Sequence, residues 1–307
     1  MWRRLDDGAP DTVGRVRSYG SEYDERWRGF EHRAGDIVIS TRSKCGTTWM
    51  QMICALLVFQ TPDLPAPLTE ISPWLDWDVE PLDTVTERLA AQLHRRIIKT
   101  HTPLDGIPLH SEVTYVVVGR NPLDVAVSLY HHSANLNRAR MAELAGKPAT
   151  EPPTRSMADW LQHWISTDAP PEVELETLRG LVHHIRDASA RMGDLDVVLV
   201  HYQDLTDDTD REMRSLAARL DIAVDDSAWP ELVAAATFDS MKRRARWHAP
   251  DQLGVLRDPD AFFRSGGVGE GSSMLTDDEL RAYEQRVGEL AERDLARWLD
   301  RGGEPPG

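Results

Sequence analysis

Four short runs of apolar residues punctuate the chain, and each is followed at once by polar or glycine-containing sequence. The runs span 35–41, 96–99, 113–119 and 196–202, and the third is apolar almost throughout. Such a run is typical of a strand that is buried on both faces of a parallel sheet. The four runs are therefore predicted to be strands.

Between these runs, apolar residues recur at the three- to four-residue spacing of helices. One predicted helix opens with Asn121 as its N-cap and Pro122 as its first residue. Strands that alternate with helices predict an α/β fold, in which a central parallel sheet is flanked by helices. We expect a single domain over 1–307, with helices near residues 46–60, 87–94, 121–134, 157–167, 176–192, 207–220, 230–236 and 277–299.

Three segments show little periodicity. Residues 1–34 are polar and arginine-rich, and they are predicted to form an N-terminal arm packed on the domain. Residues 136–156 are rich in Ala and Pro, whereas 242–276 begin basic and become rich in Gly and Ser. Long irregular segments in compact domains are frequently functional. The segments 136–156 and 242–276 are therefore predicted to be loops that contact a substrate or a cofactor.

Composition limits the class of partner. The net charge of −16 argues against nucleic acid, and against an anionic membrane surface as the main partner. The two cysteines, Cys45 and Cys54, argue against a disulfide framework and predict a cytoplasmic protein. The first residues contain no apolar h-region and no apolar run approaches about 18 residues, so neither secretion nor a transmembrane segment is expected. A homo-oligomer is compatible with this composition.

The residues after the first predicted strand combine a cation, a glycine and two hydroxyls at the start of a helix. They are Lys44, Gly46, Thr47 and Thr48. The first N–H groups of a helix have no backbone partner, and the helix dipole adds positive charge, so this position binds anions. In P-loop ATPases the Lys follows the last Gly, whereas here Lys44 precedes Gly46. The order predicts a P-loop-like phosphate-binding loop that is not built for magnesium–ATP.

Aromatic residues suggest what accompanies the phosphate. Trp49 follows the two threonines, where its ring would either stack on a purine or pack in the core. The chain has ten Trp, a high count for its length, and some are candidates for a ligand pocket. Candidates for an apolar pocket, for which simple packing is an equally good interpretation, are Trp74, Trp77, His131, His132 and Trp247.

Two other strand ends carry residues suited to phosphate chemistry. Arg120 ends the third strand and offers a planar fork to a phosphate. Ser128 follows two turns into the next helix, from which it can reach back to a ligand at the sheet edge. His101 ends the second strand, where open α/β sheets place their active sites, and Lys99 precedes it on the same side of the strand.

These residues resemble the motifs of the PAPS-dependent sulfotransferases, in the order in which that family carries them. The family transfers a sulfuryl group from 3′-phosphoadenosine 5′-phosphosulfate (PAPS) to a hydroxyl or amine, and adenosine 3′,5′-bisphosphate (PAP) is the product. The resemblance implies that His101 is the general base, a role that the ordinary imidazole pKa of about 6.5 suits. It further implies that Lys44 stabilises the leaving phosphate, that Lys99 binds sulfuryl oxygens, and that no metal is required.

The resemblance also assigns the residues that bind the donor. The 5′-phosphosulfate is expected at Lys44, Cys45, Gly46, Thr47, Thr48 and Trp49. The 3′-phosphate is expected at Arg120 and Ser128 and under a closing loop that contains Arg264, Ser265 and Gly266. The adenine is expected at Tyr202 and Phe238.

The chain departs from the family pattern at several of these positions. Cys45 replaces a Ser, so that one hydroxyl donor is lost, and Ser265 replaces a Lys of the closing loop. Gly271 stands where the family has a Trp, and Ala236 where it often has a Thr near the adenine. We expect donor binding to survive the replacement at Cys45, because backbone donors need no side chain. The changes in the closing loop predict a looser loop and a lower affinity for the donor.

The acceptor and two rival functions stay open at the level of sequence. Stretches around residues 71–76 and 99–106 resemble actinobacterial sulfotransferases, which include a glycolipid-sulfating member. The expected acceptor is therefore a small molecule or a lipid-linked molecule with a hydroxyl. One rival is a nucleotide-dependent small-molecule kinase, which predicts binding of ATP with magnesium. The other is a non-catalytic nucleotide-binding protein of the same fold. No H-x-x-H or C-x-x-C metal motif is present.

Overall fold

The computed structural model describes residues 16–151 and 154–306. Residues 1–15 of the predicted arm, and 152–153 of the first predicted loop, lie outside the described residues. The strands are β1 (Ile37–Ser40), β2 (Ile97–Thr100), β3 (Thr114–Gly119) and β4 (Val197–His201). The helices are α1 (Ser21–Trp27), α2 (Thr47–Phe59), α3 (Leu68–Ile71), α4 (Leu82–Ala91), α5 (Pro122–Asn135), α6 (Arg138–Ala145), α7 (Met157–Ser166), α8 (Leu178–Ser189), α9 (Tyr202–Asp207), α10 (Thr209–Arg219), α11 (Trp229–Ala236), α12 (Phe238–Arg243), α13 (Ala245–His248), α14 (Asp277–Leu290) and α15 (Arg293–Arg301).

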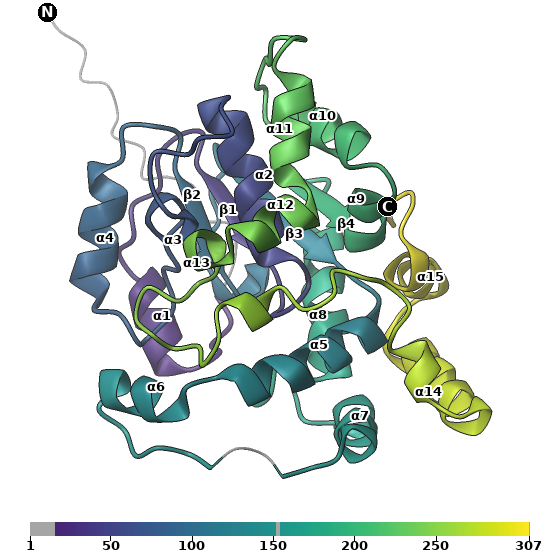
Figure 1. Cartoon of the computed structure of the whole chain (residues 1–307). Coiled ribbons are helices and arrows are strands. Elements are labelled where there is room, and N and C mark those ends of the chain that lie inside the picture. The colour runs from purple at the N-terminus through teal and green to yellow at the C-terminus, as the bar shows by residue number, and fades with distance from the viewer. Residues whose placement is uncertain (1–15, 152–153, 307) are drawn as a thin grey trace, which may run out of the picture.

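The four strands form one parallel sheet in the order β2-β1-β3-β4 (Figure 1). In register, Ile37 of β1 lies beside Ile97 of β2 and Thr114 of β3, and Tyr115 lies beside Val197 of β4. All four strands match runs that the sequence predicts as strands. Because the strands are parallel, their carboxyl ends lie at one edge of the sheet, and the loops that follow them meet there.

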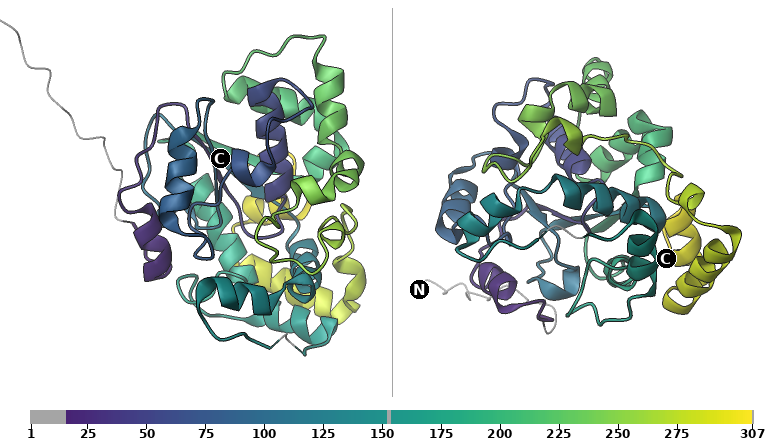
Figure 2. Two further views of the ribbon diagram at one scale, coloured as in Figure 1. Left: turned by 60° about the vertical axis from the view of Figure 1, so that its left-hand side comes forward. Right: turned by 60° about the horizontal axis from the view of Figure 1, so that its bottom comes forward.

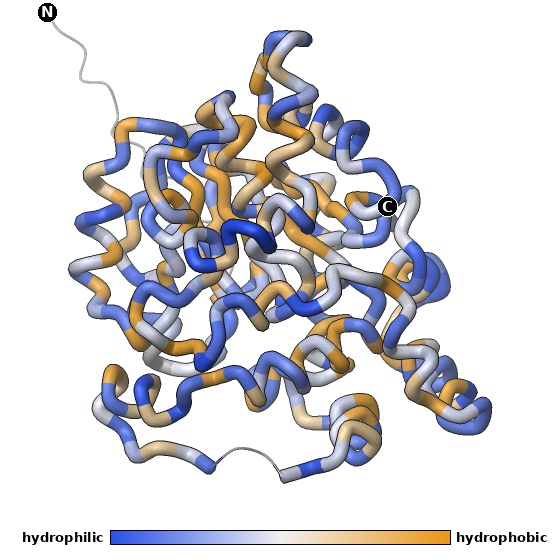
Figure 3. Tube along the Cα trace, viewed as in Figure 1, coloured by the Kyte–Doolittle hydropathy of each residue, from blue (hydrophilic) through white to orange (hydrophobic). Residues whose placement is uncertain are grey.

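Successive side chains of each strand point to opposite faces and divide the core into two clusters. Val38 and Val117 belong to one cluster, which α5, α7, α8, α14 and α15 complete. Ile39 and Val116 belong to the other, which α2, α3, α10, α11 and α12 complete. The two helical layers are visible on either side of the sheet in the turned views (Figure 2). Hydrophobic positions gather in the sheet and in helices such as α2 and α11 (Figure 3).

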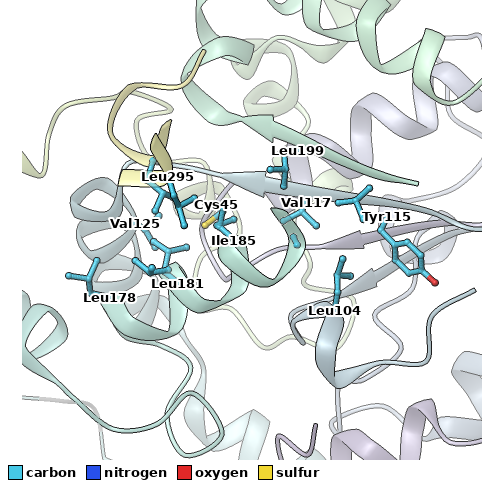
Figure 4. Packing of buried hydrophobic residues seen from close by; sticks show 14 of the residues in the cluster. Cys45, Leu104, Tyr115, Val117, Val125, Leu178, Leu181, Ile185, Leu199 and Leu295 are labelled. Atoms are coloured by element: carbon cyan, nitrogen blue, oxygen red, sulfur yellow. The ribbon is translucent and has the colours of Figure 1, made fainter. Parts of the chain in front are cut away.

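The first cluster anchors the loop that follows β1. Cys45 is fully buried among Val117 of β3, Ile185 of α8 and Leu295 of α15 (Figure 4). On the same side, helix α5 begins as the sequence predicts, with the Asn121 side chain accepting the backbone N–H of Leu123 at 3.0 Å. Burial and capping therefore fix the start of the loop after β1 and the start of α5.

Several predicted irregular segments contain helices, and one predicted helix is divided. The arm at 1–34 contains α1, which buries Trp27 in the core, and the loop at 136–156 contains α6. The predicted helix at 277–299 is α14 and α15, separated where Ala291 adopts an extended conformation. The break lets Trp298 of α15 pack on Gly119, where an added Cβ would lie 2.4 Å from its ring. Along the described residues, no helix is long and apolar enough to cross a membrane.

Candidate active site

The sheet order brings four sequence-predicted residues to one edge. His101 follows β2, Lys44 follows β1, Arg120 follows β3 and Tyr202 follows β4. The parallel strands therefore place these residues in the spatial order His101, Lys44, Arg120, Tyr202. All four line a cavity of about 170 Å³.

Almost every predicted site residue lines the same cavity. The lining includes Lys44, Gly46, Thr47, Thr48, Trp49, Lys99, His101, Arg120, Ser128, Tyr202, Phe238, Arg264, Ser265 and Gly266. Cys45 is absent from the lining, since its side chain lies in the core and its N–H bonds the Arg42 carbonyl at 3.2 Å. The expected loss of a hydroxyl donor at this position is thus corrected, because a side chain here faces away from the cavity.

Close backbone approach shapes the loop between β1 and α2. Lys44 and Gly46 both have positive φ, 69° and 108°. A Cβ at Gly46 would lie 2.9 Å from the Tyr202 ring, so only glycine fits without displacing that ring. Thr47 and Thr48 then begin α2, where the first N–H groups have no partner within the helix. The turn therefore presents amide donors and hydroxyls beside the Lys44 ammonium.

Two lysines, the buried Lys99 and the half-buried Lys44, concentrate positive charge in the cavity. Burial, together with the charges of Arg120 and Lys99, lowers the pKa of Lys44 to about 7. Burial likewise lowers the pKa of Lys99 to about 7, against the opposing effect of a nearby carboxylate. The Lys44 Nζ lies 4.1 Å from the centre of the Phe262 ring, and the Lys99 Nζ lies 3.9 Å from that of Trp74. The rings favour the ammonium forms but do not replace a bound anion.

His101 is held as a neutral imidazole with one nitrogen available. Its Nδ1 lies 2.5 Å from the carbonyl oxygen of Thr41. A carbonyl only accepts, so Nδ1 carries the proton and Nε2 carries the lone pair. Burial, followed by the charges of Lys99 and Arg42, holds the pKa of His101 well below its usual range. At neutral pH the imidazole is therefore neutral with its Nε2 lone pair available, and it is a weaker base than the ordinary imidazole expected from the sequence.

Arg120 joins the two loops that flank the cavity. Its guanidinium donates to the Lys44 carbonyl and to the Gly267 carbonyl, both at 3.0 Å. It also stacks 4.2 Å from the centre of the Tyr202 ring. Its Nε is buried without a hydrogen-bond partner among the described residues. A buried donor of a charged group is costly to leave unpaired, which points to a ligand acceptor.

The glycine-rich loop at 264–271 closes over the same edge. Arg264 forms an ion pair with Glu270 through both guanidinium NH₂ groups, one at 2.8 Å. Gly266 has a φ of 64°, and a Cβ there would lie 2.5 Å from Phe238. Asp124 of α5 accepts the N–H of Gly269 at 2.7 Å and that of Gly271 at 2.9 Å. The loop is therefore anchored, which differs from the looseness expected from the sequence.

Comparison with known proteins identifies the family. A model of the sulfotransferase domain matches residues 34–294. The chain belongs to the sulfotransferase family. It is 38% identical over 300 residues to a glycolipid sulfotransferase of Mycobacterium bovis, across 90% of this chain and 91% of the relative. A glycolipid sulfotransferase of Mycobacterium tuberculosis is 38% identical over 299 residues, with the same coverage.

Solved structures agree with the fold of this sulfotransferase. A mouse sulfotransferase complexed with PAP has a TM-score of 0.67 and 21% identity, over 92% of this chain and 94% of that chain. Retinol dehydratase, in a complex with retinol and PAP, has a TM-score of 0.67 and 18% identity, over 87% of this chain and 84% of that chain. The predicted α/β fold is thereby confirmed, and the domain model with the mycobacterial relatives confirms the predicted family.

The shape and charge of the sulfotransferase cavity suit a polyanion attached to a flat ring. The lysine ammonium groups and the orphaned Arg120 Nε supply donors, and Gly46 and Gly266 let the rings of Tyr202 and Phe238 pack closer to the two loops than a Cβ would allow. Trp49 packs in the core and also lines the cavity, since it is 9% exposed and donates to the Ala236 carbonyl at 2.8 Å. Ser128 lines the cavity from α5.

A buried carboxylate that sequence reasoning missed positions His101. The Asp76 Oδ2 accepts hydrogen bonds from the hydroxyls of Thr100 and Thr102, the residues on either side of His101. Its Oδ1 accepts the Nε1–H of Trp74 at 2.7 Å, and Trp74 packs edge-on against the imidazole at 4.6 Å. Three contacts thus fix the backbone and one wall around the base. A lone Asp between two Trp in a loop gave no signal of this.

A second missed network links the loop after β1 to the strand of the base. Arg42 donates to the His101 carbonyl and, at 2.6 Å, to Glu176. Ser43 donates to the same Glu176 oxygen at 2.7 Å. Arg42 and Glu176 lie 134 positions apart in sequence, so no local pattern reveals their contact.

The candidate acceptor residues divide among three places. Trp74 and His132 line the cavity, and burial lowers the pKa of His132 to about 3. Trp77 stacks on Trp74 at 4.9 Å and lines a smaller adjacent pocket. His131 and Trp247 lie outside both. Among the described residues, no three His, Cys, Asp or Glu side chains group as ligands for a metal ion.

Proposed function

We propose that this sulfotransferase moves a sulfuryl group from PAPS to a hydroxyl of its acceptor, with His101 as the general base. The observation that carries the proposal is the neutral imidazole, its Nε2 available, in one cavity with two lysines and the start of helix α2. Family membership and the two mycobacterial relatives support sulfuryl transfer as the reaction.

We assign the donor-binding roles by the chemistry of each group. The amides and hydroxyls of Thr47 and Thr48 suit the 5′-phosphate, and Lys44 suits the oxygen that leaves with it. Arg120 and Ser128, with Arg264 after release from its ion pair, suit the 3′-phosphate. The remaining donor contacts are assigned to Lys99 for the sulfuryl oxygens and to Tyr202, Phe238, Trp49 and the loop at 264–266 for the nucleoside.

The chemical step needs one proton acceptor and groups that stabilise the negative charge on the leaving phosphate. The donor supplies an electrophilic sulfur with a phosphate as leaving group. His101 Nε2 accepts the proton as the acceptor O–H bond breaks and the new O–S bond forms. Lys44 stabilises the charge that appears on the departing phosphate oxygen. Asp76 and Arg42 fix the strand end, which keeps the imidazole oriented without covalent catalysis.

We infer a hydroxyl of a lipid-linked sugar as the acceptor, because the relatives at 38% identity are named glycolipid sulfotransferases. We assign Trp74 and His132, which line the cavity together with His101, to contact with the acceptor. We infer a cytoplasmic setting, since Cys45 and Cys54 are buried free thiols, which suits a reducing compartment.

Calorimetric titration with PAP and with ATP–magnesium separates this proposal from a kinase. PAP should bind, and ATP–magnesium should bind far more weakly, because it lacks a 3′-phosphate. Incubation with labelled PAPS and a panel of glycolipids should transfer the label. Tight ATP–magnesium binding without PAP binding would favour the kinase. Binding of PAP with no transfer to any hydroxyl acceptor would favour a non-catalytic nucleotide-binding protein.

A further inference from the structure

A compact basic patch lies on α12 and α13 and does not line the cavity described above, although the Lys242 Nζ donates to the Arg264 carbonyl at 3.2 Å. Lys242, Arg243, Arg244 and Arg246 are all exposed, and Trp247 follows them with 47% of its surface exposed. Figure 3 shows this stretch as blue tube at the front of the molecule. In the described part of the chain, Trp247 is the one exposed tryptophan. Four cations with no acidic residue among them stand out in a protein of net charge −16.

The two helices that carry the basic patch also form a wall of the active-site cavity. Phe238 and Met241 of α12, and Pro250 just after α13, line the cavity. Ala245 and His248 are buried on the same inner side. None of the patch residues lines the cavity. The inner side of this short helical pair therefore faces the reaction, and its outer side presents the cations and Trp247 next to the cavity.

Acidic neighbours compensate the basic patch only weakly. Arg244 lies 3.7 Å from Asp63, and Arg246 lies 3.9 Å from Asp260, with all four side chains more than half exposed. Exposed pairs at such distances contribute little. The structure gives Arg243 no ion pair with any described residue. The net negative charge of the whole protein does not cancel the patch either. Salt screens charges that lie more than about 8–10 Å apart, so the charges close to a bound partner determine its binding.

The aromatic part of the patch indicates which anionic partner fits. Trp247 and Arg244 line a surface groove of about 340 Å³ with Pro62 and Leu64, which adds apolar area beside the cations. Tryptophan next to Lys and Arg is the composition of protein surfaces that bind at the membrane–water interface. An exposed tryptophan that faces away from the cavity does not contact a nucleotide bound inside it.

We propose that the basic patch docks the protein on an anionic lipid surface and so presents the cavity to lipid-linked acceptors. The interpretation of the acceptor rests on the proposed function, whereas docking itself does not. The docking proposal revises the expectation that the net charge argues against an anionic membrane surface as the main partner. Each Lys or Arg near an anionic bilayer strengthens binding about 5-fold, so the patch supports reversible, salt-sensitive attachment.

Vesicle sedimentation of the full chain tests docking without donor or acceptor. The probes are phosphatidylcholine vesicles with and without phosphatidylglycerol, at low and high salt. The test variants are Arg243→Gln/Arg244→Gln/Arg246→Gln and Trp247→Ala. A matched control on α14 and α15 removes the same charge from other exposed arginines: Arg281→Gln/Arg293→Gln/Arg297→Gln.

Wild type and the control triple variant should bind the anionic vesicles at low salt and release them at high salt. The patch triple variant should bind about 100-fold more weakly, and Trp247→Ala should also lose affinity. Equal binding of the two triple variants, or no binding by wild type, would overturn the proposal. So would equal binding of wild type to poly-glutamate, which would indicate an acidic protein as the partner.

Two further measurements separate this inference from the proposed function. Transfer of label from PAPS to a water-soluble acceptor should be the same in the patch triple variant and in wild type. Loss of PAP affinity in that variant, without vesicle binding by wild type, would reassign the patch to donor steering and overturn docking. Vesicle binding by a wild-type protein that transfers no label would support docking while refuting the proposed reaction.

Discussion

Binding of PAP is expected to draw protons onto Lys44 and Lys99. Burial lowers the pKa of each from 10.5 to about 7 in the protein alone, so each amine is about half protonated near neutral pH. The 5′-phosphate of PAP, placed against Lys44 and beside Lys99 where the sulfuryl group has left, favours both ammonium forms and raises both pKa values. Binding should therefore take up protons, and the affinity for PAP should fall as the pH rises above about 7.

The magnitude follows from the two pKa values. At about pH 8 roughly one-tenth of each amine is protonated without PAP, so binding should take up ~0.9 proton per lysine and ~1.8 in total. Above about pH 8 the affinity should fall roughly 10-fold per pH unit for each lysine, or ~100-fold for both. Below about pH 6 both amines are already charged, and this source of pH dependence vanishes.

Calorimetry in buffers of different ionisation enthalpy measures the proton uptake directly. Lys99→Met should reduce the uptake by about one proton. Lys147→Met, at an exposed lysine outside the cavity that pairs with Asp78, is the matched control and should leave the uptake unchanged. PAP binding that is tight but takes up no protons near pH 8 would show that its phosphates do not stabilise the two ammonium groups.

Three substitutions test the rest of the site. Arg120→Ala should weaken PAP binding by about 1.5–3 kcal/mol in calorimetry, since it removes charged hydrogen bonds; unchanged affinity would refute its assignment. Gly46→Ala should cost about 1–3 kcal/mol of unfolding free energy in denaturant titration, because it strains a positive φ and crowds Tyr202. Gly193→Ala, with open space around it, is the control and should cost far less. Asp124→Asn should speed amide exchange in the loop at 264–271; unchanged protection would mean that other contacts hold the loop.

The strands and the residues that follow them were predictable because both depend on local pattern. Continuous apolar runs mark strands buried on two faces, and Asn121 with Pro122 marks the start of α5. Once the strands are parallel, topology alone brings His101, Lys44 and Arg120 to one edge. The short helices α6, α9, α12 and α13 were not predicted, because tertiary packing rather than periodicity stabilises helices of this length.

Side-chain direction and long-range pairing could not be read from the chain. Cys45 points into the core because Lys44, just before it, adopts a left-handed conformation, which sequence spacing does not reveal. Asp76 and Glu176 organise the base and the phosphate loop from distant segments. Their contacts depend on the finished fold, so their positions looked like those of ordinary surface carboxylates.

The central claim is that His101 removes the acceptor proton during sulfuryl transfer from PAPS. Single-turnover transfer of labelled sulfuryl groups, measured for wild type and His101→Ala with PAP affinity determined in parallel, tests it most directly. The account predicts transfer by wild type and a rate about 10²–10⁴-fold lower in the variant, with PAP affinity retained. A variant that binds PAP normally and transfers at the wild-type rate would contradict it.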